Sequence, residues 1–99
     1  MDSGWFQKNI EPRLAGCSFT YSSFSRGHFG DRERVEVAAG RKLATMEFWS
    51  EGWVGIDVYD LDRDDQVMNT LISPEENYLV VRVIERMVNL MTSAGDGAW

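Results

Sequence analysis

The side chains that most often carry catalysis are scarce in this chain, which has one cysteine, Cys17, and one histidine, His28. A thiol beside an imidazole could act as a nucleophile, because the imidazole can take the proton of the thiol. However, His28 lies in a glycine-flanked segment, and nothing around Cys17 builds the sharp turn or the amide donors of an oxyanion hole. We therefore expect no catalytic residues and interpret His28 as an exposed side chain.

Acidic residues at alternate positions, Asp60, Asp62 and Asp64, imitate the first ligands of a calcium-binding loop. The imitation ends there, because Asp65 stands where such a loop needs glycine and Leu71 where it needs a bidentate glutamate. A single cysteine and a single histidine exclude a structural zinc site. We expect no metal and no cofactor. The three aspartates are either a solvated turn or contacts to basic residues of a partner.

The pattern that organises the chain is a predicted β-hairpin over residues 42–61, in which two alternating segments flank Ser50-Glu51-Gly52. A two-residue loop would place Glu47 on the apolar face, whereas a three-residue loop with Gly52 in the left-handed conformation keeps that face apolar. We predict the three-residue loop. Its strand pairs are Trp49 with Trp53, Phe48 with Val54, Met46 with Ile56 and Ala44 with Val58.

This register collects aromatic and acidic side chains on the opposite face of the hairpin. Its members are Glu47, Trp49, Trp53, Asp57 and Tyr59. Trp and Tyr are over-represented among residues that dominate binding energy, and an exposed apolar patch on a small protein usually marks an interaction site. The alternative is that an N-terminal helix or a loop covers the aromatic residues and makes them a second small core.

The segments before the hairpin are predicted to form a short helix and two strands. The helix would carry its apolar side chains on one side, at Trp5, Phe6, Ile10 and Leu14. Ser3 can cap it, and Pro12 either ends or kinks it. Alternation predicts strands over residues 17–24 and 32–37, joined by a glycine-containing loop over residues 25–32.

After the hairpin, an acidic turn over residues 60–65 leads to a last strand over residues 66–71. The strongest helix signal follows at Ser73-Pro74-Glu75-Glu76, which forms a capping box with proline at the first helical position. An apolar stripe then recurs with helical spacing at Val80, Val83, Ile84, Met87, Val88 and Met91. Gly95 can close this helix, and residues 93–99, with Trp99 loose or docked, are expected to fray.

These elements predict one domain over residues 1–99 with an α+β fold, in which an antiparallel sheet of about five strands packs on a C-terminal helix. Sixteen acidic residues against ten basic ones give a net charge of -6 and a pI near 4.6. This charge disfavours nucleic acid and anionic membranes as partners and favours a basic protein. No apolar run spans a bilayer, the N-terminus lacks the pattern of a signal peptide, and a cytoplasmic location is expected.

One stretch also resembles a known family. Val35-Glu36-Val37, the segment GRKLATMEFWSEG over residues 40–52 and the strand that continues to Asp57 are similar to the TriTu family of bacterial immunity proteins. The similarity extends over residues 31–91 as a valine-rich strand, a strand ending in Trp, a glycine-containing turn, an apolar strand and an amphipathic helix. It departs at the N-terminus, where Pro12 allows only a shorter helix than the family has.

The resemblance implies a cytoplasmic antitoxin that needs no catalytic residues. It would bind a cognate Rhs toxin delivered by a type VI secretion system, an ADP-ribosyltransferase that acts on elongation factor Tu, and occlude its active or target-binding site. We hypothesise a one-to-one complex in which an aromatic anchor and an acidic rim contact a basic toxin surface. The anchor is Trp49, Trp53 and Tyr59, and the rim is Glu47, Asp57, Asp60, Asp62 and Asp64. The alternatives are a secretion chaperone or adaptor that holds an effector segment, and an enzyme that uses Cys17 and His28.

Overall fold

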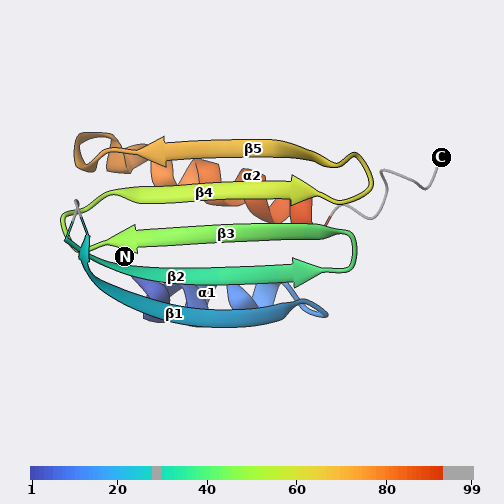
Figure 1. The fold of residues 1–99 in the computed structure, drawn as a ribbon, viewed down its shortest axis with the longest axis horizontal. Coiled ribbons are helices and arrows are strands. Elements are labelled where there is room, and N and C mark those ends of the chain that lie inside the picture. Colours follow the sequence, from blue (N-terminus) through green and yellow to red (C-terminus); the bar gives the residue numbers. More distant parts are fainter. Residues whose placement is uncertain (28–29, 93–99) are drawn as a thin grey trace.

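The computed structural model describes residues 1–27 and 30–92, and it has the predicted α+β architecture. A five-stranded antiparallel sheet runs in the order β1-β2-β3-β4-β5, so each strand pairs with its neighbour in sequence (Figure 1). The strands are β1 Ser18–Gly27, β2 Gly30–Ala39, β3 Lys42–Trp49, β4 Val54–Asp60 and β5 Asp65–Ile72. The helices are α1 Ser3–Asn9, the 3-10 helices η1 Glu11–Arg13 and η2 Pro74–Leu79, and α2 Val80–Thr92.

The central hairpin has the predicted register. Phe48 lies opposite Val54, and beyond it the Trp49 amide donates to the Trp53 carbonyl over 2.9 Å. Gly52 has a φ of 100°, the left-handed conformation that the three-residue loop requires. The remaining predicted pairs, Met46 with Ile56 and Ala44 with Val58, are also present.

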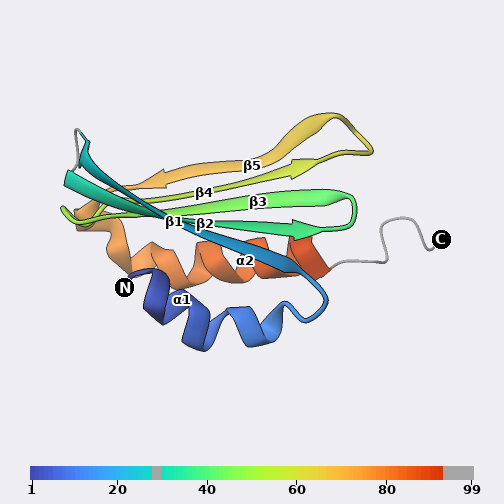
Figure 2. The same cartoon turned by 60° about the horizontal axis from the view of Figure 1, so that its bottom comes forward.

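Both α-helices lie against the same face of the sheet, and one hydrophobic core fills the space between them (Figure 2). The α2 stripe buries Val80, Ile84, Met87, Val88 and Met91, while Val83 is only partly buried. From the N-terminus, Phe6, Ile10 and Leu14 are buried in the same core, and Phe6 meets Phe19 of β1 edge to face with ring centroids 6.5 Å apart. The sheet contributes the alternate residues of β2 to β5.

The ends of the helices differ in detail from the expectations. Asp2, not Ser3, caps α1, because its carboxylate accepts from the Trp5 amide over 2.9 Å. The α-helix ends before Pro12, which lies in η1 instead. The capping box at Ser73 is present, but the residues after it form η2, so α2 begins only at Val80. The first turn is closed by a bond from the Glu76 amide to the Ser73 carbonyl, which is the i+3 spacing of a 3-10 helix.

The predicted loop over residues 25–32 is wrong for most of its length. Strand β1 continues to Gly27 and β2 begins at Gly30, and these two glycines pair with each other. The polar composition is typical of a loop, but this segment pairs with β2 on both sides of a register shift between Phe24 and Gly27. His28 lies outside the described residues, as do Gly95, Trp99 and the tail that we expect to fray. No helix in the described part of the chain has the length and apolar content needed to cross a membrane.

Candidate binding site on the open sheet face

Because α1 and α2 cover one face of the sheet, the other face carries no helix from the described residues (Figures 1 and 2). We call this surface the open face. Strand register places on it the side chains that alternate with the core residues. They include Phe24, Arg32, Arg34, Glu36, Leu43, Thr45, Glu47, Trp49, Asp57, Tyr59, Asn69 and Leu71. Three of its apolar side chains, Phe24, Leu43 and Leu71, rank among the most exposed large hydrophobic residues of the described chain.

The Trp49 indole lies across the neighbouring strand, over Gly55. A Cβ atom added to Gly55 would stand 3.2 Å from Cζ3 and 3.3 Å from Cη2 of this ring. Glycine in the middle of a strand usually marks such a close approach, and an aromatic ring over it shields the bare backbone. The indole is thus fixed on the open face and bridges β3 and β4.

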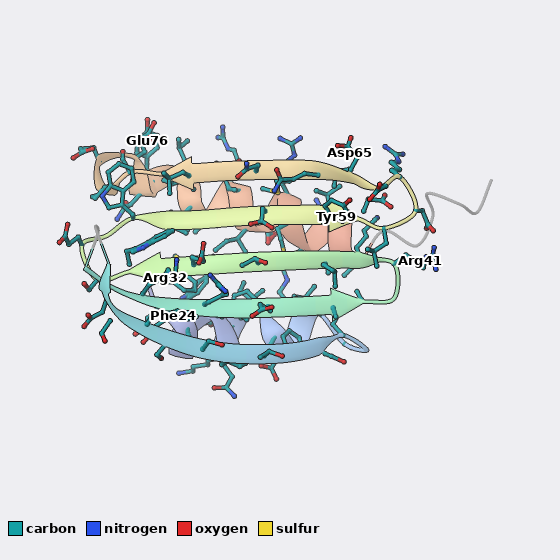
Figure 3. All side chains as sticks on the ribbon, viewed as in Figure 1. Phe24, Arg32, Arg41, Tyr59, Asp65 and Glu76 are labelled. Atoms are coloured by element: carbon teal, nitrogen blue, oxygen red, sulfur yellow. The ribbon has the colours of Figure 1, made fainter. Side chains whose placement is uncertain are left out.

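A group of stacked arginines occupies the side of the open face formed by β1 and β2 (Figure 3). The guanidinium carbons of Arg32 and Arg34 lie 4.4 Å and 4.9 Å from the centre of the Phe24 ring. Both arginines also pair with Glu47 of β3, over 3.3 Å from Arg32 and 3.1 Å from Arg34. Glu47 is therefore engaged by two cations, and it does not present a free negative charge as the hypothesised acidic rim required.

Asp57 lies near the centre of the open face, with Thr45 of β3 and Asn69 of β5 directly beside it. Burial raises the pKa of this carboxyl and the charge of Glu47 raises it further, whereas Arg34 lowers it. No hydrogen bond or ion pair joins the carboxylate to any other residue in the described part of the chain. Asp57 is thus a half-buried carboxylate without a partner of its own.

The acidic turn after β4 is arranged differently from the expectation. Asp60 is only 6% exposed, because it continues the inward alternation of β4, and its carboxylate accepts from the amides of Asp62 and Arg63. Asp62 pairs with the exposed guanidinium of Arg41 over 2.7 Å. Asp64 accepts a hydrogen bond from the Tyr59 hydroxyl, and this bond raises the pKa of Tyr59. Asp60 therefore does not belong to the open face, and the other two acids already have partners.

Trp53 lies at the end of the open face, next to the β3–β4 turn. Together with Trp49 it lines a hollow of about 130 Å³ whose other walls include Met1 and residues of η2 and α2. Trp53 is partly buried there. The structure thus groups Glu47, Trp49, Asp57 and Tyr59 on one surface and places Trp53 at its margin. The alternative that the N-terminal helix covers this surface is not what the structure has, because α1 packs on the other side.

Three open-face residues with a clear role were missed from the sequence: Phe24, Arg32 and Arg34. The alternation of residues 32–37 already placed Arg34 opposite Val35 and Val37. The sequence alone does not show how β1 pairs with β2, and it is this pairing that puts Phe24 directly beside Arg32. Without that pairing, the two arginines had no aromatic neighbour.

Two further observations concern metal binding and nucleophilic chemistry. No group of three or more His, Cys, Asp or Glu side chains within residues 1–27 and 30–92 is arranged to hold a metal ion. Burial raises the pKa of Cys17, which favours the thiol over the nucleophilic thiolate. A scan against protein-family models and searches of curated proteins and of solved structures find no match to this chain.

Proposed function

We propose that this chain is a cytoplasmic immunity protein that binds a cognate bacterial toxin through its open face. The observation that carries the proposal is the sheet face left uncovered by both helices, on which aromatic, arginine and carboxylate side chains lie together. An antiparallel sheet can keep one face in water, so the support comes from the exposed apolar side chains on this face, which are typical of an interaction surface. The similarity to TriTu-type immunity proteins supports the same function.

The chemistry of the face favours a protein partner. A net charge of -6 repels the phosphates of nucleic acids at long range. Tryptophan, tyrosine and arginine are the residues that most often dominate protein interfaces, and all three are present on this face. Exposed Leu43 on the central strand β3 and Leu71 on the edge strand β5 add apolar area.

To inhibit a toxin, such a surface needs only to cover the active or target-binding site of the toxin. An ADP-ribosyltransferase must admit an anionic dinucleotide and its protein target, so the rim of its cleft is expected to be basic. An acidic domain is attracted to that rim, and once bound, it can block the active or target-binding site without chemistry of its own. The complex is proposed to contain one copy of each protein.

The test is toxin neutralisation in growing cells, with the candidate toxin domain encoded beside this chain as the partner. Co-expression should restore growth, and light scattering of the purified mixture should give a one-to-one complex. Leu71→Arg on the open face should abolish rescue, whereas the matched variant Val81→Arg, on exposed α2, should not. Equal effects of the two variants would contradict the open face as the binding surface. A dimer that binds only an unfolded effector segment would instead favour a chaperone.

A further inference from the structure

The acidic residues near the open face are not equally able to meet a partner. Glu47 is shared by two arginines, Asp62 pairs with Arg41, and Asp64 accepts from Tyr59. In the described part of the chain, each of these carboxylates would have to give up an existing bond before it could take a new one. Asp57 would give up none, because it has no hydrogen bond or ion pair to another described residue.

The surroundings of Asp57 are those of a site for a cation. Along β4, Gly55 under the Trp49 indole precedes it and Tyr59 follows it, each two residues away on the same face. Residues two apart on a strand are separated by about 7 Å, so Asp57 lies between Gly55, which the Trp49 indole covers, and Tyr59, whose hydroxyl is bonded to Asp64 of the turn. Aromatic rings attract ammonium and guanidinium groups, and a carboxylate near them adds a charge-assisted hydrogen bond. Across the strands, Thr45 and Asn69 offer further oxygen acceptors.

The charges of the open face also favour a cation at this point. Two arginines and one glutamate leave the region formed by Phe24, Arg32, Arg34 and Glu47 with a formal charge of +1 (two minus one). Asp57 carries a negative charge on β4 next to this group, where Glu47 raises and Arg34 lowers the pKa of its carboxyl. A partner would therefore bind in one orientation, with its basic side chain over β4 and away from β2.

We propose that Asp57 is the docking point for an arginine or lysine side chain of the protein partner, with Trp49 and Tyr59 as its aromatic neighbours on the same face. This inference rests on the proposed function for the identity of the partner. It adds to that function the residue that recognises the partner and the chemical class of the group recognised. It also moves recognition away from the acidic turn, where Asp60 is buried and Asp62 and Asp64 are engaged.

The site can be tested with a defined probe, N-acetyl-arginine amide, added to the isotope-labelled protein at low salt and followed by amide NMR shifts. We expect saturable shifts centred on Thr45, Asp57 and Asn69. N-acetyl-norleucine amide, which has an aliphatic side chain and no charge, should not produce them. Asp57→Asn should weaken arginine-amide binding by about tenfold or more, because it removes a charge-assisted bond. Asp62→Asn removes the same formal charge from the exposed turn and should leave the dissociation constant within about twofold.

Shifts centred on residues 61–65, or equal weakening by Asp57→Asn and Asp62→Asn, would overturn the inference. The spectrum of Asp57→Asn alone shows whether the variant keeps its fold. Failure of this inference and of the proposed function are distinguishable. If arginine amide does not bind at Asp57 but the chain still neutralises a toxin, only the docking point is wrong. If Asp57 binds arginine amide but no toxin is neutralised, the proposed function is wrong and the cation site stands.

Discussion

Two substitutions that remove the same number of carbon atoms from opposite faces of the sheet give the sharpest test of how the domain is built. Ile56 on β4 is 1% exposed and lies in the core under the helices, whereas Leu71 on β5 is 51% exposed on the open face. Ile56→Ala removes a fully buried side chain and leaves a cavity, for which the expected loss is about 2–5 kcal/mol. Full burial of leucine contributes about 1.5–3 kcal/mol, and Leu71 is about half buried, so Leu71→Ala should cost about 0.7–1.5 kcal/mol.

The free energy of unfolding of both variants can be measured by urea denaturation followed by far-UV circular dichroism at 25 °C. A domain of this size is expected to have a total stability of about 5–15 kcal/mol, so the Ile56→Ala loss should be large and easily measured. Unchanged m-values would show that the same surface is exposed on unfolding. Equal losses for the two variants would refute the assignment of a buried face and an open face.

Three further outcomes are expected from single substitutions. Because burial and Glu47 raise the pKa of Asp57, its contribution to stability falls as pH rises through that pKa, so Asp57→Asn should gain stability relative to wild type from about pH 3 to about pH 7. The prediction is wrong if the free energy of unfolding of Asp57→Asn relative to wild type, measured by urea denaturation, stays constant or decreases as pH rises. The buried Lys42 ammonium donates to the Leu90 carbonyl near the end of α2 over 2.9 Å, and Lys42→Met should therefore cost about 1.5–3 kcal/mol in the same assay. A loss below about 0.5 kcal/mol would show that this bond contributes little. Trp53→Ala should weaken binding of the proposed toxin partner, measured by calorimetry, by about 2 kcal/mol with little loss of fold. Unfolding of that variant would instead assign Trp53 to the core.

The parts of the fold that were predictable are those set by local sequence. The register of the central hairpin follows from Gly52 and from the alternation on either side of it. The α2 stripe follows from its helical spacing, and its position on the sheet follows from the need to bury it. The end of α1 before Pro12 is likewise a local effect of a residue without an amide donor.

The parts that were not predictable depend on pairing between distant segments. The serine-rich end of β1 has weak strand character of its own, and only its hydrogen bonds to β2 make it a strand. That same pairing brings Phe24 to the arginines of β2. The charge of Asp60 favours an exposed turn. Its position, however, is two residues after Val58 in the series Val54, Ile56 and Val58, and therefore on the buried side of β4. The alternation of buried residues in β4 thus extends beyond the last apolar one, Val58, to the charged Asp60.

The central claim is that the open face, and not the outer surface of the helices, meets the toxin. A crystal structure of the complex tests it most directly. We predict an interface over β2 to β5 that buries Trp49 and Leu71 and places a basic toxin side chain on Asp57. An interface centred instead on Tyr78 and Val81, the exposed apolar residues of η2 and α2, would contradict the claim.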